Sequence, residues 1–216
     1  MIYINLGFPK TATTNLQTNI YPVLDGIKYL GKFYINRSEN QNELFRTINL
    51  YIERRKIFSN LEYKNLVDEF KNYCIKYKKI LISQESWVYS YQKNNFSKKW
   101  EITPQEIKLK NLLSFLNQSD IPYKFFIVQR DIKSSIKSLH VQSREAIRLL
   151  FGEKFLDLDY FLNYIYKKKN NHKDLLLNIN CFNLKNIKKI IPENKITVFN
   201  YEDITNNPKK FLQHLF

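Results

Sequence analysis

Short runs of apolar residues alternate along the chain with longer segments in which apolar residues recur every three or four positions. The short runs are typical of strands buried on both faces, and the longer segments of amphipathic helices. The predicted strands span residues 2–6, 80–83, 123–128 and 195–199. The predicted helices span residues 11–20, 41–58, 61–77, 103–116, 131–150, 158–168 and 183–191, with a last one opening at Pro208. This alternation predicts an α/β fold with a central, mostly parallel sheet flanked by helices, whose ligands bind at the carboxyl ends of the strands.

Length and composition narrow the class of protein. The chain has 216 residues, 44% of them hydrophobic, with only 4 Gly and 6 Pro, so we expect one folded domain over residues 1–216. Cys74 and Cys181 lie far apart, which predicts neither a disulfide framework nor a thiolate zinc site. Neither a leader segment nor an apolar run long enough to span a membrane is present, and we therefore predict a cytoplasmic protein.

Charge adds an expectation about partners. The formal net charge of +15 predicts an anionic partner, but nucleic acid, a phosphorylated small molecule, an acidic glycan and an anionic membrane all satisfy it. The lysine clusters at 167–169, 188–189 and 209–210 are typical of solvated helix faces. They could also attract an acidic acceptor or a membrane surface.

The turn after the first strand is the first candidate site. Residues 7–14 read Gly-Phe-Pro-Lys-Thr-Ala-Thr-Thr, between a strand and a predicted helix. Backbone N–H groups at a helix start, the Lys10 ammonium and the hydroxyls of Thr13 and Thr14 could together hold a phosphate. The order of residues differs from a Walker A loop. The alternative interpretation is that Thr11 only caps the helix and Lys10 is a surface lysine.

A second candidate follows the strand at 123–128. Arg130 leaves the carboxyl end of this strand, and Ser138 lies eight residues later, about two helical turns on. An arginine fork and a hydroxyl could hold a second phosphate. Alternatively, Arg130 forms an ion pair and the serines face solvent.

Together these segments resemble the sulfotransferase family that uses 3′-phosphoadenosine 5′-phosphosulfate (PAPS). Residues 7–14 look like the family's 5′-phosphosulfate loop, and residues 128–138 look like its 3′-phosphate motif. Residues 196–204, followed by Asn207-Pro208, are similar to the strand and Tyr-Glu-Asp turn of the bacterial and Golgi-type members. The resemblance spans almost the whole chain and implies a P-loop-like sulfotransferase fold.

The resemblance also implies roles for individual residues. The 5′-phosphosulfate would be held by Lys10, Thr11, Ala12, Thr13 and Thr14, and the 3′-phosphate by Arg130 and Ser138. Sulfuryl transfer then needs a cation for the leaving group, for which Lys10 is placed, and no metal.

A general base completes the predicted site. Glu85 follows the strand at 80–83 and resembles the Ser-x-Glu turn of members that use a carboxylate, so it is the predicted base. Alternatively it is a solvated or paired loop carboxylate. His140 is the rival base, but its position down a helix favours a surface or packing role.

The sequence departs from the family pattern in three places. Ala12 replaces a usual Gly, and Ile132 replaces a frequent Pro. The chain also ends at Phe216, before the basic segment that closes over the 3′-phosphate in many members, so either this protein is a short variant of the family or its C-terminal closing segment is missing.

These observations predict a PAPS-dependent, nucleotide-binding enzyme that sulfates a hydroxyl, on a glycan or glycolipid, with nucleic acid not the expected partner. Two alternatives stay open. One is a nucleotide kinase-like phosphotransferase with an altered phosphate loop. The other is a non-catalytic basic module that binds nucleic acid through lysines and aromatic residues.

Overall fold

The computed structural model describes residues 1–7, 15–31, 39–88, 104–142, 144–167 and 184–215. Within these ranges five parallel strands form one sheet in the order β2-β3-β1-β4-β5. They are β1 (Ile2–Asn5), β2 (Lys28–Gly31), β3 (Ile80–Ser83), β4 (Tyr123–Gln129) and β5 (Ile196–Asn200). The predicted α/β fold with a parallel central sheet is confirmed, and the strand order is compatible with a P-loop-like fold.

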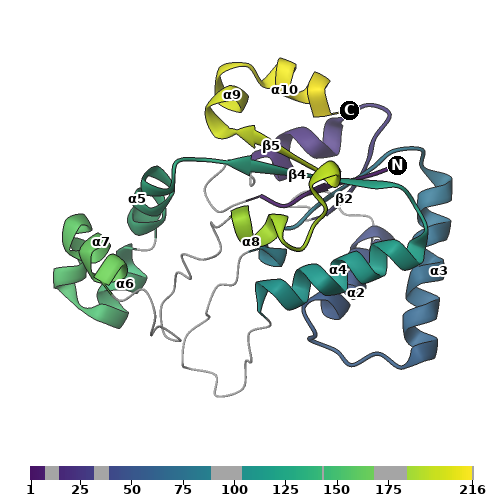
Figure 1. Ribbon diagram of the computed structural model, residues 1–216, viewed down its shortest axis with the longest axis horizontal. Coiled ribbons are helices and arrows are strands. Elements are labelled where there is room, and N and C mark those ends of the chain that lie inside the picture. The colour runs from purple at the N-terminus through teal and green to yellow at the C-terminus, as the bar shows by residue number, and fades with distance from the viewer. Residues whose placement is uncertain (8–14, 32–38, 89–103, 143, 168–183, 216) are drawn as a thin grey trace.

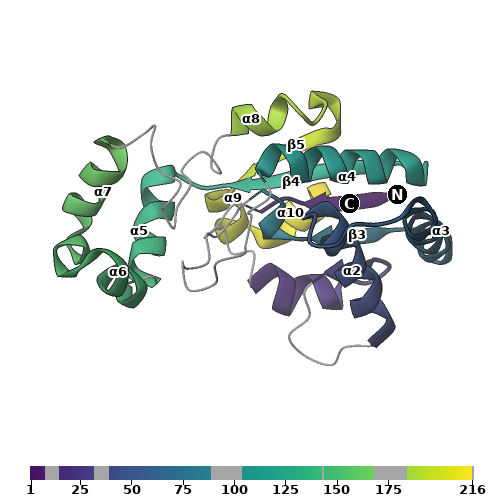
Figure 2. The same ribbon diagram turned by 90° about the horizontal axis from the view of Figure 1, so that it is seen from below.

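Helices cover both faces of this sheet (Figures 1 and 2). One face packs against α2 (Glu39–Ile52), α3 (Asn60–Lys76), α4 (Gln105–Ser119) and α8 (Leu184–Lys188). The other face packs against η1 (Leu16–Ile20), η2 (Tyr21–Val23), α9 (Tyr201–Asn206) and α10 (Pro208–Leu215). Beyond the carboxyl end of β4 lie α5 (Ile132–Gln142), α6 (Arg144–Phe151), η4 (Glu153–Leu156) and α7 (Leu158–Lys167). Two short 3-10 turns, η3 (Glu85–Trp87) and η6 (Glu193–Lys195), complete the described elements.

The strands are apolar because helices cover both of their faces. All four residues of β3 are buried, and in β1 Ile2 and Ile4 face one layer while Tyr3 and Asn5 face the other. Burial of such side chains contributes about 1.5–3 kcal/mol each, so the central strands anchor the fold.

Several boundaries differ from the sequence prediction. The helix predicted over 41–58 ends at Ile52, because Arg54 adopts a left-handed conformation (φ 52°) there. The Arg54 and Arg55 amides donate to the carbonyls of Tyr51 and Leu50 (3.1 and 2.9 Å), which closes the helix in a Schellman motif. The helix predicted over 131–150 is two helices, α5 and α6, and neither β2 nor α9 was predicted.

Candidate functional site

The three predicted site segments follow the carboxyl ends of neighbouring strands, and these strand ends together form one edge of the sheet. In the middle of the sheet β1 lies between β3 and β4, and Asn5 is in register with Ser83 and Phe126. The chain leaves β1 toward β2 on one side and leaves β4 toward β5 on the other, so a topological switch point lies between β1 and β4. Open parallel sheets bind their ligands at such points.

The predicted phosphate loop begins at this switch point. The Leu6 amide donates to the Phe126 carbonyl (3.0 Å), so the chain follows β4 one residue beyond β1 before the loop starts. Lys10, Thr11, Ala12, Thr13 and Thr14 lie outside the described residues, and their predicted roles stay predictions. After the loop, the chain resumes in the π-helical segment η1 (Leu16–Ile20), an uncommon form that is often associated with functional sites.

Buried polar side chains lie beneath the carboxyl ends of β1 and β3. The Asn5 amide donates to the Tyr21 hydroxyl and the Gln17 amide to the Ser83 hydroxyl, both at 2.8 Å. Burial raises the pKa of Tyr21 well above its ordinary value, so its hydroxyl stays neutral. Within the described residues no donor reaches Asn5 Oδ1 or, on the β3 side, Gln84 Oε1, although both side chains are buried. Two buried acceptors at this edge therefore remain available to an N–H or O–H group.

The predicted base lies in a turn whose residues before and after Glu85 are hydrogen-bonded to α2. Glu85 opens η3, directly after the buried Gln84. Asn49 Oδ1 of α2 accepts from Gln84 Nε2 (3.2 Å) and from Trp87 Nε1 (2.7 Å), and thus holds the residues on either side of Glu85. Just past the end of α2, the buried Glu53 accepts a hydrogen bond from the Ser86 hydroxyl.

Side chains of helix α4 also donate hydrogen bonds to the backbone of this turn. Lys108 Nζ donates to the Ser86 carbonyl (2.7 Å), and Gln105 Nε2 donates to the Val88 carbonyl (2.9 Å). Lys108 is only 5% exposed, and burial lowers its pKa, against the opposing effect of the Glu53 carboxylate. Glu53 in turn pairs with Arg55 Nε at 2.7 Å.

The Glu85 carboxylate takes no part in these hydrogen bonds. Gln84, Ser86, Trp87 and Val88 are each bonded to α2 or α4, whereas no hydrogen bond or ion pair within the described residues holds the half-buried Glu85 carboxylate. A carboxylate displayed on a rigid turn can accept a proton from a bound hydroxyl. The sequence predicted Glu85 at a strand end but did not identify the residues that hold this turn.

Arg130 lies against a ring from the neighbouring strand end. Gln129 pairs with Asn200 in the β4–β5 ladder, which brings the next residue of each strand together. The Arg130 guanidinium lies 4.6 Å from the centroid of the half-buried Tyr201 ring. The guanidinium carbon therefore lies over the ring at a distance typical of a cation–π contact.

Asp131 caps the amino end of the helix that follows Arg130. The Asp131 carboxylate accepts from the Ser134 amide (2.8 Å), and this bond holds the pKa of Asp131 below its ordinary value. Ser138 is half-buried and shares a helical face with Ser134, roughly 9 Å along α5 from the helix start. The neighbouring Ser135 hydroxyl is buried without a partner in the described part of the chain.

The other predicted base, His140, is committed to packing. It is buried, with Nε2 2.8 Å from the Phe155 carbonyl and its ring 4.9 Å from that of Phe161. These contacts join α5 to η4 and α7. They support the packing interpretation of this histidine and leave Glu85 as the candidate at the sheet edge.

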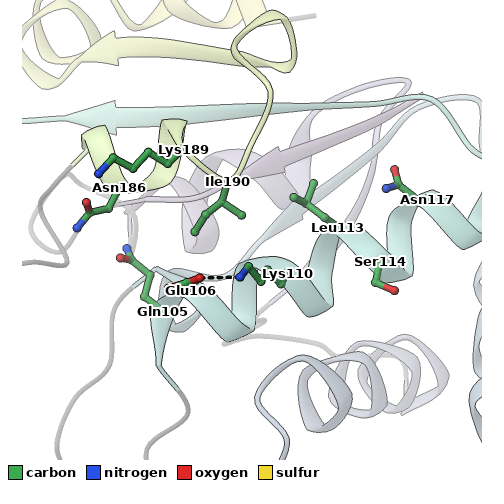
Figure 3. A pocket seen from close by; sticks show the side chains of 9 residues that line it. All are labelled: Gln105, Glu106, Lys110, Leu113, Ser114, Asn117, Asn186, Lys189 and Ile190. Carbon is green, nitrogen blue, oxygen red and sulfur yellow. Dashed lines mark hydrogen bonds and ion pairs between the residues drawn. The ribbon is translucent and has the colours of Figure 1, made fainter.

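A groove of about 820 Å³ runs between α4 and α8 (Figure 3). Most of its described lining residues are polar, with a Lys110–Glu106 ion pair of 2.6 Å on one side and two aliphatic side chains inside. The lining residues are Gln105, Glu106, Lys110, Leu113, Ser114, Asn117, Asn186, Lys189 and Ile190. Because Gln105 also bonds to Val88, this end of the groove adjoins the turn that carries Glu85.

Comparisons with known proteins add no family assignment. No protein-family model matches the sequence, and no curated protein matches it either. None of the helices in the described ranges has the length and apolar character needed to cross a membrane. In the same ranges no three His, Cys, Asp or Glu side chains gather in a way that could hold a metal ion.

Proposed function

We propose that this protein is a PAPS-dependent sulfotransferase. The observation that carries the proposal is the arrangement of strands β3, β1 and β4. Glu85, the loop after Gly7 and Arg130 follow three adjacent parallel strands and leave the sheet at the same edge, with the loop in the middle. Adjacent strands are about 4.8 Å apart, so roughly 10 Å separates the strands of the proposed base and the proposed 3′-phosphate ligand.

The donor nucleotide fits the residues on the β1 and β4 side of this edge. Lys10, Thr13 and Thr14 would bind the 5′-phosphosulfate, and Arg130 with Ser138 would bind the 3′-phosphate. Tyr201 supports this role of Arg130, because the cation–π contact holds the guanidinium beside the carboxyl end of β4, and a guanidinium fork suits a phosphate. The buried oxygens of Asn5 and Gln84 would accept from a lysine ammonium or a ligand hydroxyl.

The chemistry asks little of the protein beyond placement and charge. PAPS supplies a sulfuryl group whose bond to the bridging oxygen breaks as the acceptor oxygen bonds to sulfur. Glu85 takes the proton of the acceptor hydroxyl, and the Lys10 ammonium offsets the charge that develops on the leaving oxygen. Asn49 and Lys108 hold the residues that follow Glu85, and this support would keep the carboxylate within reach of the acceptor hydroxyl.

The groove between α4 and α8 is the proposed acceptor site. Amides, a hydroxyl and lysines line it, which suits a hydroxyl-rich and partly acidic acceptor such as a glycan or the head of a glycolipid. It adjoins the Glu85 turn, as an acceptor site must. We place the reaction in the cytoplasm.

A thermal-shift comparison of three ligands tests the proposal. Adenosine 3′,5′-bisphosphate should stabilise the protein, by about 2.7 kcal/mol at a hundredfold excess over its Kd. ATP with Mg²⁺ and a short oligonucleotide should have little effect. Stabilisation by ATP-Mg²⁺ alone would identify a kinase-like protein, and stabilisation by the oligonucleotide alone would identify a nucleic-acid-binding module.

A further inference from the structure

The amino ends of the strands form the edge of the sheet opposite the candidate site, and this edge is strongly basic. Five lysines surround the amino ends of β2 and β3 there, and we name them the amino-edge patch. They are Lys28, Lys76, Lys78, Lys79 and Lys209. All but the half-buried Lys28 are exposed. In Figure 1 this edge is marked by the N-terminus, whose amino group donates to the Lys78 carbonyl (3.1 Å).

Backbone and ring contacts hold the patch together. The Lys28 amide donates to the Lys79 carbonyl at 2.9 Å, where β2 and β3 begin. The ammonium groups of Lys28 and Lys76 lie 5.2 and 5.6 Å from the centroid of the Tyr77 ring. The lysines therefore belong to one surface formed by the end of α3, two strand starts and α10.

An apolar pocket of about 460 Å³ opens within the patch. Leu24, Ile27 and Leu212 contribute its aliphatic side chains, and Lys78 and Lys79 line it beside them. Lys209 of α10 lies on its other side. Asp25 is the one acidic residue in the described lining, so cationic groups outnumber anionic ones at the opening.

Two exposed aliphatic side chains are direct chain neighbours of residues of the patch or its pocket. Ile75, directly before Lys76, is 79% exposed, and Val23, directly before Leu24, is 75% exposed. Exposed aliphatic groups among lysines suit an interface that has both anionic head groups and an apolar interior. Nucleic acid offers phosphates but would leave these aliphatic groups in water, and the Tyr77 ring of the patch is half-buried with two of the lysines over it.

We infer that the amino-edge patch binds an anionic membrane surface. The lysines contact acidic lipid head groups, while Val23 and Ile75 enter the boundary between head groups and acyl chains. The pocket beside them takes part of an acyl chain or glycerol backbone. This inference does not depend on the proposed sulfuryl transfer, because the patch lies at the opposite edge of the sheet.

Vesicle sedimentation of the full chain tests this inference. The protein should bind phosphatidylcholine vesicles that contain phosphatidylserine, and bind pure phosphatidylcholine far more weakly. Each lysine contributes about a fivefold gain in binding, so the double variant Lys78→Gln, Lys209→Gln should bind roughly 30-fold more weakly. The variant Val23→Ser, Ile75→Ser should lose the part of the binding that survives high salt.

A matched control changes the same charge elsewhere. Lys133 and Lys137 are exposed on α5, beyond the other edge of the sheet, and Lys133→Gln, Lys137→Gln should bind vesicles like the wild type. Absence of binding to acidic vesicles, or equal losses in the two double variants, would overturn the inference. So would a loss of affinity for a single-stranded oligonucleotide, rather than for vesicles, in the Lys78 and Lys209 variant.

Discussion

The turn after β3 and the segment after β4 leave the same edge of the sheet but are held in different ways. The β3 turn is bonded to two helices through the partly or fully buried side chains of Asn49, Glu53 and Lys108. Arg130, after β4, is supported by a cation–π contact with the Tyr201 ring, and Asp131 caps the following helix at the surface. In the proposed enzyme this difference has a reason. A base must keep a fixed distance to the reacting hydroxyl, whereas a phosphate ligand can adjust its side chain as the nucleotide enters.

The strongest test of this contrast is the base itself. Glu85→Gln should lower the rate of sulfuryl transfer by roughly 10²–10⁴-fold, because the amide cannot take the acceptor proton. Binding of adenosine 3′,5′-bisphosphate should be unchanged. Radiolabelled sulfate transfer and calorimetric titration measure the two quantities.

Glu202, an exposed carboxylate after β5, provides the control for this substitution. Glu202→Gln should leave turnover intact. Full turnover of Glu85→Gln would remove Glu85 as the base.

Arg130→Ala should act on the nucleotide and not on the turn. Loss of hydrogen bonds from a charged donor costs about 1.5–3 kcal/mol, so affinity for adenosine 3′,5′-bisphosphate should fall by roughly 10- to 150-fold. Affinity for adenosine 5′-phosphate, which lacks the 3′ group, should hardly change. Equal losses for both nucleotides would contradict the assignment, and the exposed Lys133→Ala offers a neighbouring control.

Asn49→Ala should act on the turn and not on the nucleotide. The substitution leaves Trp87 Nε1 and Gln84 Nε2 without their acceptor, so we expect a loss of about 2 kcal/mol in the free energy of unfolding, seen in urea titrations. The rate of transfer should also fall while nucleotide affinity stays the same. Thr47→Ala on the same helix should change neither, and a weakened nucleotide affinity in Asn49→Ala would show that the two regions are not separate.

The smallest effect is expected at Tyr201. Removal of the ring in Tyr201→Leu takes away a cation–π contact of about 0.5–1 kcal/mol, which should weaken 3′-phosphate binding by roughly two- to fivefold. Tyr201→Phe keeps the ring and should bind the nucleotide nearly as well as the wild type. Equal losses in the two variants would mean that the hydroxyl, and not stacking on Arg130, is what matters.

Periodicity predicted the parts of the fold whose pattern is local. The apolar runs of β1, β3, β4 and β5 mark strands that are covered by helices, and their carboxyl ends identify the candidate edge. Strand β2 was missed because Lys28 and Gly31 shorten its apolar run to two residues. The end of α2 was missed because a left-handed Arg54 gives no glycine signal.

The hydrogen bonds that hold the turn around Glu85 are tertiary contacts, which hydrophobic periodicity does not predict. One of these contacts nevertheless has a signal in the sequence, since Lys108 lies four residues before Leu112 on the apolar side of its helix. A lysine at such a position needs a buried partner, but the sequence does not name the Ser86 carbonyl. Likewise, nothing local pairs Arg130 with Tyr201, because the register of two distant strands brings them together.

The central place of β1 has a consequence for biosynthesis. This strand is made first, yet both of its partners, β3 and β4, come much later in the chain. At typical rates of translation, roughly 6 to 24 s pass before Phe126 follows Asn5 out of the ribosome's active centre. During that interval Ile2, Ile4 and Leu6 lack at least one of the two strands that flank β1. The newborn chain therefore carries an incompletely paired strand, which a chaperone can shield until β3 and β4 close around it.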